Sequence, residues 1–285
     1  MHQLAAGIYS RHTKEKLKRF IEELELVMVD LDECIFPGIT TVTMYRKVCL
    51  SLILSWKLEN YVLLARLVIG AVAMGLMQIG QSLSPDITNK ALIFFFARII
   101  KPIPVSYLQK AVKSIPGGSY AGARETLELL SEKANLGIIS QGLDVVLKEY
   151  VKQFTGTDGS VIDFWDANVL SALISCRSQA KPETVFICGR EDKEAPARKR
   201  IAQFNPRRMM VIGHNTDDLG MMKVVKEHDG IIVGFNPTAR IKRLCDVVVT
   251  GRDWMGLRQM FQEVMCEVSP REAYIVPAGP GTQES

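Results

Sequence analysis

The residues best suited to chemistry in this sequence are two aspartates at the end of an apolar run. Residues 24–31 are mostly apolar, and Asp30 and Asp32 stand at the carboxyl end of the run. The pattern predicts a buried strand of a parallel sheet. Because side chains alternate along a strand, the two carboxylates could share one face. Such a pair could act as nucleophile and general acid–base, or hold a hard cation. The alternative reading is two solvated acids at a strand end.

Polar residues also follow the other strand-like runs. The runs cover residues 136–140, 209–213, 230–235 and 246–249. The polar residues at their ends are Ser140, Gln141 and Gly142, then His214, Asp217 and Asp218, then Asn236, then Thr250. Helical patterns at 122–134, 143–154, 195–204 and 219–228 separate the runs. This alternation predicts an α/β fold with a parallel sheet, in which ligands bind at the carboxyl ends of the strands.

One long block interrupts the alternation. Residues 38–115 are rich in apolar side chains, look helical, and lie between Pro37-Gly38 and Pro116-Gly117-Gly118. We expect them to form an inserted helical domain. The predicted organisation is an α/β core at 1–37 and 116–268, the helical insertion at 38–115, and a disordered tail at 269–285.

The insertion contains one stretch that is long enough to cross a bilayer. Residues 61–80 carry one charge, Arg66, in twenty residues. A single crossing would put Asp30 and Ser140 on opposite sides of the membrane, and the neighbouring apolar runs are too short for a second crossing. The sequence therefore favours a helical bundle with an apolar interior. Peripheral contact with a membrane stays open but is not favoured.

Composition narrows the function classes. The chain has 285 residues, of which 47% are hydrophobic and 23% charged, which excludes disordered, collagenous and coiled-coil proteins. The formal net charge of +4 is too weak to indicate nucleic-acid binding. Residues 1–20 read as a Lys/Arg-rich helix without the apolar segment of a signal peptide, so we expect a cytoplasmic protein.

These motifs together resemble the haloacid dehalogenase superfamily, in its phosphoserine phosphatase-like group. The first family motif is Asp-x-Asp after a strand, matched by Asp30 and Asp32. The second is a strand ending in Ser or Thr, matched by Ser140. The third is a lysine about twenty residues before the fourth motif, matched by Lys193, with Lys199 as the fallback. The resemblance implies a three-layer Rossmann-like core with a parallel sheet and, at 38–115, a helical cap.

The resemblance also implies the activity and the roles of residues. It indicates a divalent-metal-dependent phosphatase that hydrolyses a small phosphate monoester through an aspartyl-phosphate on Asp30. Asp32 would be the general acid and base, and Ser140 and Lys193 would stabilise the phosphoryl group. The phosphate and substrate would be bound by Ser140, Gln141, Gly142, Lys193 and Asn236. The metal, Mg²⁺ in the family, would be held by Asp30, Asp32, His214, Asp217 and Asp218.

Two departures from the family pattern concern the metal and the substrate. His214 stands where the family has an aspartate, and imidazole suits softer metals better than Mg²⁺, so Mn²⁺ or another divalent ion is an alternative. Phosphoserine phosphatases have a glutamate that binds the substrate amine, and Ile39 stands at about that position here. Glu33 comes too early in the sequence to be that glutamate. We therefore expect a small phosphorylated metabolite other than phosphoserine. The alternatives are an impaired binding or regulatory protein, a phosphotransferase and a lipid-phosphate phosphatase.

Overall fold

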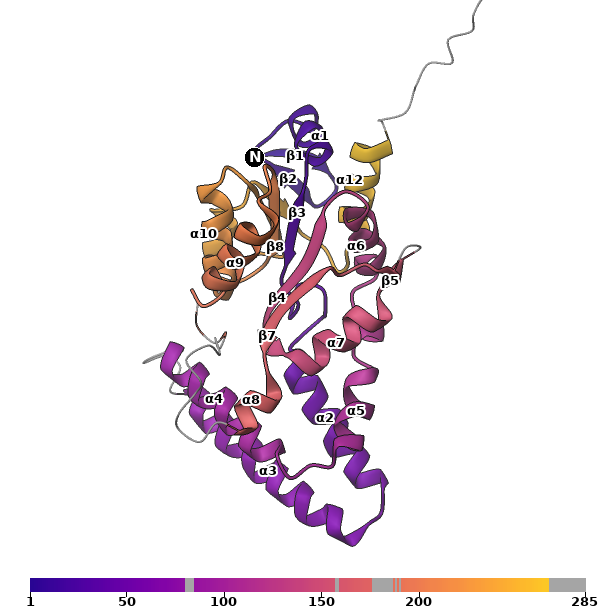
Figure 1. Cartoon of the computed structure of the whole chain (residues 1–285), viewed down its shortest axis with the longest axis vertical. Coiled ribbons are helices and arrows are strands. Elements are labelled where there is room, and N and C mark those ends of the chain that lie inside the picture. Colours follow the sequence, from indigo (N-terminus) through magenta and orange to yellow (C-terminus); the bar gives the residue numbers. More distant parts are fainter. Residues whose placement is uncertain (80–84, 157–158, 176–186, 188, 190, 267–285) are drawn as a thin grey trace, which may run out of the picture.

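The protein is built around one mixed, mostly parallel sheet. The computed structural model describes residues 1–79, 85–156, 159–175, 187, 189 and 191–266. The sheet has eight strands in the order β1-β2-β10-β9-β8-β3-β4-β7 (Figure 1). Its strands are β1 (His2–Ala5), β2 (Ile8–Ser10), β3 (Leu26–Val29), β4 (Asn135–Leu143), β7 (Phe164–Asn168), β8 (Met209–Gly213), β9 (Ile231–Phe235) and β10 (Val247–Val249). From β10 to β7 every pairing is parallel, whereas β2 pairs antiparallel with both β1 and β10.

Helices cover both faces of the sheet, and strand alternation explains how. On β3, Leu26 and Met28 pack into one apolar cluster, beneath α9 and α10, while Val27 and Val29 pack into the other. All four are buried, which is why this strand is apolar throughout. The helices of the core are α1 (Lys14–Glu22), α6 (Ala123–Ser131), α7 (Asp144–Gln153), α8 (Leu170–Ser175), α9 (Glu194–Phe204), α10 (Leu219–Glu227), α11 (Ala239–Lys242) and α12 (Met255–Cys266). The core is therefore the three-layer α/β structure that the sequence predicts.

The N-terminal prediction was partly wrong. Residues 1–20 were expected to be one basic helix, but β1 and β2 form a hairpin and α1 begins only at Lys14. Thr13 caps α1 by accepting a hydrogen bond from the Lys16 N–H. The hairpin pairs with β10, which provides backbone partners that the local sequence does not reveal. The strand β7 was also not predicted, and a small hairpin joins β5 (Thr155–Gly156) to β6 (Gly159–Ser160).

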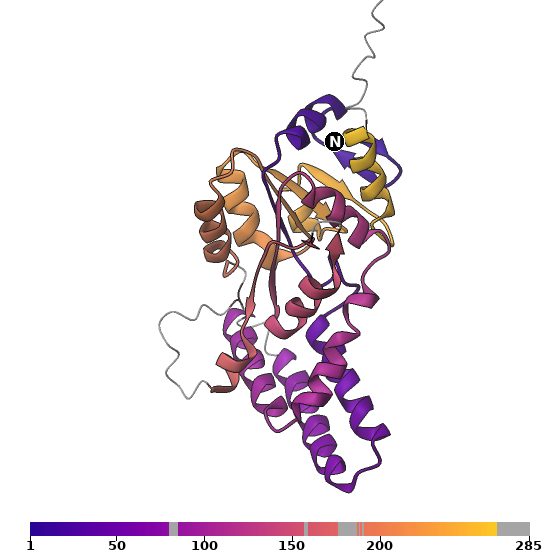
Figure 2. The same ribbon diagram turned by 45° about the vertical axis from the view of Figure 1, so that its right-hand side comes forward.

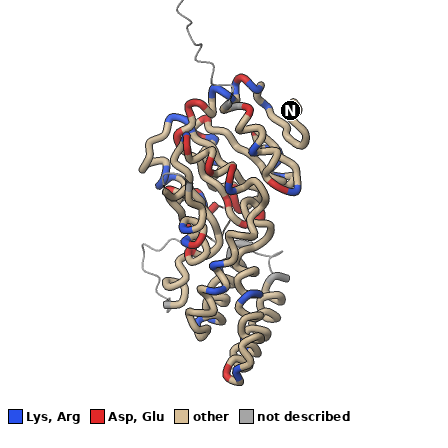
Figure 3. The backbone as a smooth tube through the Cα atoms, turned by 90° about the vertical axis from the view of Figure 1, so that its right-hand side faces the viewer, with Lys and Arg blue, Asp and Glu red and all other residues tan. Residues whose placement is uncertain are grey.

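Helices inserted after β3 form a separate group, which we call the helical cap. It consists of α2 (Thr40–Leu54), α3 (Leu58–Ile79), α4 (Pro85–Ile100) and α5 (Val105–Lys113). Figures 1 and 2 show that the cap extends from the end of the core, where it meets α7 and α8. Most charged positions lie on the core, whereas the cap is largely uncharged (Figure 3).

The expectation of an apolar cap interior fails for α3. Leu58–Met77 has a mean hydropathy of 1.7, yet only 17% of its most apolar stretch is buried. It is the one helix among the described residues that is long and apolar enough to cross a membrane. Since α3 packs against α2 and α4 on one side, Val62, Ile69 and Leu76 on its outer side stay exposed.

Candidate active site

The predicted residues meet at the carboxyl ends of three neighbouring strands. The strands β8, β3 and β4 are adjacent in the sheet, and all three are parallel. Asp30 follows β3 directly, Ser140 lies in β4, and His214 follows β8. A pocket of about 230 Å³ opens at this edge. It is lined by Asp30, Asp32, Glu33, Ile39, Thr41, Gln141, His214, Asn215 and Asp217.

Lys193 is buried at this edge of the sheet, at the start of α9. Its Nζ lies 2.5 Å from Asp30 Oδ1 and 2.7 Å from Asp218 Oδ1, and its side chain has no exposed surface. Burial alone would lower the pKa of Lys193, but the charges of Asp218 and Asp30 raise it well above its usual value. The lysine therefore stays cationic. Lys199, the fallback in the sequence, is exposed on α9.

The loop after β8 is held by Asp218. Its Oδ2 accepts the backbone N–H of His214 at 2.8 Å and that of Asn215 at 3.1 Å. Burial opposes ionisation of Asp218, yet Lys193 and His214 hold its pKa below the usual range. The neighbouring Asp217 has its pKa raised to about 7, by burial and by the charge of Asp218.

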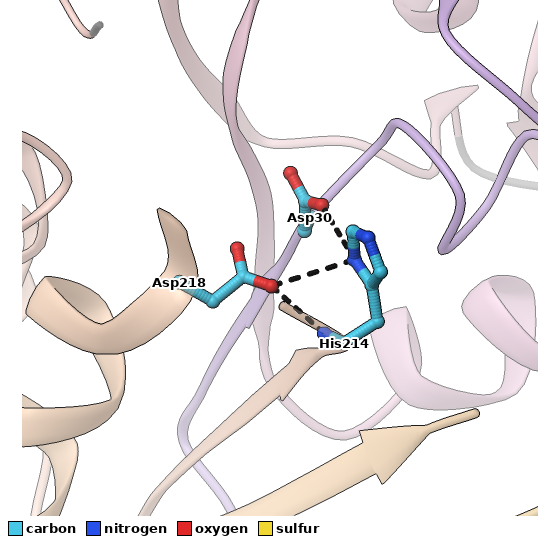
Figure 4. A group of neighbouring side chains, drawn as sticks. All are labelled: Asp30, His214 and Asp218. Atoms are coloured by element: carbon cyan, nitrogen blue, oxygen red, sulfur yellow. Dashed lines mark hydrogen bonds and ion pairs between the residues drawn. The ribbon is translucent and has the colours of Figure 1, made fainter. Parts of the chain in front are cut away.

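The ring of His214 faces Asp30 and Asp218 with one nitrogen (Figure 4) and Glu33 with the other. Nδ1 is 3.3 Å from Asp30 Oδ2 and 3.5 Å from Asp218 Oδ2, while Nε2 is 3.1 Å from Glu33 Oε2. Burial would lower the pKa of His214, but these interactions with Asp218 and Asp30 raise it to about 11. Without a metal ion the ring is therefore a cation.

The second aspartate faces the end of β4. The Thr40 N–H, at the start of α2, donates to Asp32 Oδ1 at 2.8 Å. The pKa of Asp32 is raised to about 6, first by burial and then by the charge of Asp30. Ser140 is buried, and its Oγ accepts the Gly142 N–H at 2.9 Å. A Cβ on Gly142 would lie 3.1 Å from that oxygen, so glycine keeps this space open.

The residues present fit a divalent metal ion. Asp30, His214 and Asp218 each offer one ligand atom, and these atoms lie within 4.8 Å of one another. Asp30 Oδ2, His214 Nδ1 and Asp217 Oδ1 are buried atoms without a hydrogen-bond partner. His214 Nδ1 and Asp30 Oδ2 face each other at 3.3 Å without forming a hydrogen bond, and buried polar atoms are normally paired, so the three atoms are suited to ligate a metal ion. The acids of this edge also outnumber its cations, and a divalent ion would offset that charge before a phosphate enters.

Asn236 neither lines the pocket nor has a side-chain hydrogen bond to another predicted site residue. Its side chain donates to Gly251 O at 2.7 Å and accepts the Gly251 N–H at 3.0 Å. It ties the loop after β9 to the loop after β10, two strands away from β3, so its contacts give no support to the predicted role in substrate binding. Gln141 does line the pocket, and its side-chain amide donates to Gly189 O at 3.2 Å.

Thr40 and Glu33 contact predicted site residues but were given no role by sequence reasoning. Thr40 is buried and its Oγ1 has no hydrogen-bond partner, although its backbone N–H binds Asp32. Glu33 was set aside because it comes too early for the family's substrate-reading glutamate, yet it contacts His214. A hydroxyl at the start of the helix after the first motif was the available signal for Thr40; no local signal marks Glu33.

Comparison with known proteins identifies the fold. No family model matches the sequence, and the search of curated proteins finds no match. A cytosolic 5′-nucleotidase IIIB bound to cytidine superposes with a TM-score of 0.65 at 11% identity, covering 93% of this chain and 94% of that chain. A phosphoserine phosphatase in apo form gives 0.55 at 15%, covering 87% and 100%. A probable phosphoserine phosphatase from Vibrio cholerae gives 0.59 at 13%, covering 87% and 68%.

These similarities confirm the fold that the sequence motifs indicated. The chain shares the Rossmann-like fold of these phosphatase and nucleotidase structures, which agrees with the resemblance of its motifs to the haloacid dehalogenase superfamily. At 11–15% identity these similarities show the fold alone. The chemistry is therefore inferred from the residues of this chain.

Proposed function

We propose that this protein is a divalent-metal-dependent phosphohydrolase that cleaves phosphate monoesters through an aspartyl-phosphate on Asp30. The observation that carries the proposal is the placement of Lys193, buried between Asp30 and Asp218 at the end of β3. Burying a cation costs desolvation free energy, and packing of the core does not require a charged side chain at this position. It suits a site where a phosphoryl group adds negative charge beside a carboxylate.

The first half of the reaction breaks the ester. The Asp30 carboxylate attacks phosphorus, the bond from phosphorus to the ester oxygen breaks, and the Asp32 carboxyl gives its proton to the departing alkoxide. A carboxyl whose pKa lies at about 6 can be protonated near neutral pH. Lys193 stays cationic and offsets the charge on the phosphoryl oxygens.

The second half restores the enzyme. Asp32 takes a proton from water, the water oxygen attacks the phosphorus of the aspartyl-phosphate, and inorganic phosphate leaves Asp30. Ser140 and the backbone around Gly142 bind phosphoryl oxygens, because Gly142 leaves that space open. A metal held by Asp30, His214 and Asp217 or Asp218 would supply Lewis-acid stabilisation of the phosphoryl charge.

The proposal includes the domain assignment. The α/β core at 1–37 and 116–268 holds the catalytic groups, and the insertion at 38–115 is the cap that covers them. The substrate is a phosphorylated metabolite in the cytoplasm.

Phosphate release from a panel of monoesters tests the function, with Mg²⁺, Mn²⁺, Co²⁺ and Zn²⁺ supplied in turn. We expect metal-dependent release that Asp30→Asn abolishes while its melting temperature shows that it stays folded. Acid-quenched wild-type enzyme should carry labelled phosphate on Asp30, and Asp32→Asn should accumulate it. Folded wild-type protein that releases no phosphate with any of these metals contradicts the proposal.

A further inference from the structure

A second and more apolar cavity lies directly beside the polar pocket. Its volume is about 510 Å³, and it lies between α2, α3 and α4 and the carboxyl end of β4. Ile39, Thr41 and Gln141 line both cavities, so the two are neighbours with a shared wall. Any ligand with its phosphate at Asp30 has this cavity as the adjoining space for its organic group.

The lining of this cavity is apolar on the cap side. Val42, Met74, Ile93 and Phe96 contribute to it, with Ile39 at the shared wall. Arg46 is the one charged residue among the described residues that line it. Ligand pockets have volumes of about 300–1,000 Å³ and mostly apolar linings. The cavity therefore has the size and chemistry of a ligand site.

We infer that the substrate is an amphiphilic phosphate monoester, with its phosphate at Asp30 and an apolar organic group of several carbons in the cap cavity. The inference rests on the proposed function and specifies its substrate class. Apolar carbon gains free energy when it leaves water for such a lining, and each buried methylene strengthens binding about fourfold.

The same lining disfavours phosphoserine. The ammonium group of phosphoserine needs a carboxylate or carbonyl partner when it is removed from water. No acidic residue is among the described residues of the cap cavity, and its charged residue, Arg46, repels an ammonium. The acids of the neighbouring pocket surround the phosphate position instead.

Gly75 offers a way to fill the cavity. It lines the cavity from α3, and a Cβ placed on it would meet no atom within 4 Å. Gly75→Phe therefore adds a ring where the apolar group would lie. Val72→Phe is the matched control, because Val72 lies on the same helix, is 61% exposed and does not line the cavity.

Binding and hydrolysis are measured separately. Calorimetry compares ethylphosphonate with hexylphosphonate, which cannot be hydrolysed, and phosphate release compares ethyl phosphate, hexyl phosphate and phosphoserine. We expect the hexyl compounds to exceed the ethyl compounds at least tenfold in affinity and in kcat/KM. Gly75→Phe should reduce both ratios at least tenfold, and Val72→Phe should leave them unchanged.

The outcomes separate this inference from the proposed function. Equal affinity for both phosphonates, or a hexyl preference that folded Gly75→Phe retains, overturns the inference even if esters are hydrolysed. Tight hexylphosphonate binding without hydrolysis of any ester supports the cavity and contradicts the phosphohydrolase.

A lipid phosphate in a bilayer would present the same chemistry. Dioleoyl phosphatidic acid in phosphatidylcholine vesicles is the third arm of the experiment. Faster release from the vesicles than from monomeric hexyl phosphate assigns the substrate to the bilayer, and release from hexyl phosphate alone assigns it to solution. Release from neither, while ethyl phosphate is cleaved, overturns the inference.

Discussion

His214 Nε2 lies 3.1 Å from Glu33 Oε2, while Nδ1 of the same ring faces Asp30 Oδ2 at 3.3 Å. Glu33 reaches this position from a left-handed backbone, with φ of 58°, which is uncommon for a residue other than glycine. Its N–H donates to Gly38 O at 3.0 Å and closes the turn that follows Asp32. The turn thus places a carboxylate on one nitrogen of the ring and leaves the other to face Asp30 and Asp218.

Removing the charge of Glu33 should weaken metal binding without removing a ligand. A histidine ligand is oriented by a carboxylate on its second nitrogen, and loss of such a partner costs about 10–100-fold in metal affinity. We expect Glu33→Gln to raise the Kd for Mn²⁺ about tenfold in calorimetry. Glu132→Gln, at an exposed position after α6, is the control. An unchanged Kd in Glu33→Gln would show that Glu33 does not act through His214.

His214→Asp should change which metal is preferred. The substitution replaces an imidazole nitrogen with carboxylate oxygen, the ligand type that Mg²⁺ prefers, and removes one that suits Zn²⁺ and Co²⁺. We expect the ratio of Mg²⁺ to Co²⁺ affinity to rise at least tenfold in competition titrations. The Co²⁺ absorption spectrum of wild-type protein should also change on substitution. A spectrum identical in both proteins would show that His214 is not a ligand.

Lys193→Met should be strongly destabilising. The substitution leaves Asp30 and Asp218 buried with no ammonium between them, and breaking a buried pair in this way costs about 3–5 kcal/mol. Urea denaturation in the presence of a chelator measures the free energy of unfolding. Lys199→Met, on the exposed side of α9, should change it by less than about 0.5 kcal/mol. Similar losses in the two variants would contradict the buried pairing.

Gly142→Ala should impair phosphate binding more than stability. The added methyl would lie 3.1 Å from Ser140 Oγ and 3.3 Å from Thr40 Oγ1, in the space assigned to phosphoryl oxygens. We expect kcat/KM to fall at least tenfold, and inorganic phosphate to inhibit less. Gly117→Ala is the control, because a Cβ there would meet nothing within 4 Å. Wild-type kinetics in Gly142→Ala would place the phosphate elsewhere.

Several features of the protein were decided by local sequence. The apolar runs before Asp30, Ser140 and His214 are strands β3, β4 and β8, as predicted, because strands buried on both faces need continuous apolar side chains. Parallel strands bring their carboxyl ends to one edge of the sheet, but which ends are neighbours depends on the strand order, which the family resemblance implied and strand periodicity did not. The helical nature of 38–115 followed from composition in the same way.

Other features depended on contacts between distant segments. The sequence already favoured Lys193 over Lys199 by its spacing, but the contact of Lys193 with Asp30, 163 residues away in the chain, is made by packing. The contact between Glu33 and His214 joins residues 181 positions apart, and it requires a left-handed turn that no local sequence pattern predicts. The N-terminal hairpin exists because β10 provides its backbone partners. Local sequence decides the periodicity of each helix and strand. The side chains that meet in the site are selected by how the sheet and cap pack. These residues lie too far apart in the chain for a local sequence pattern to relate them.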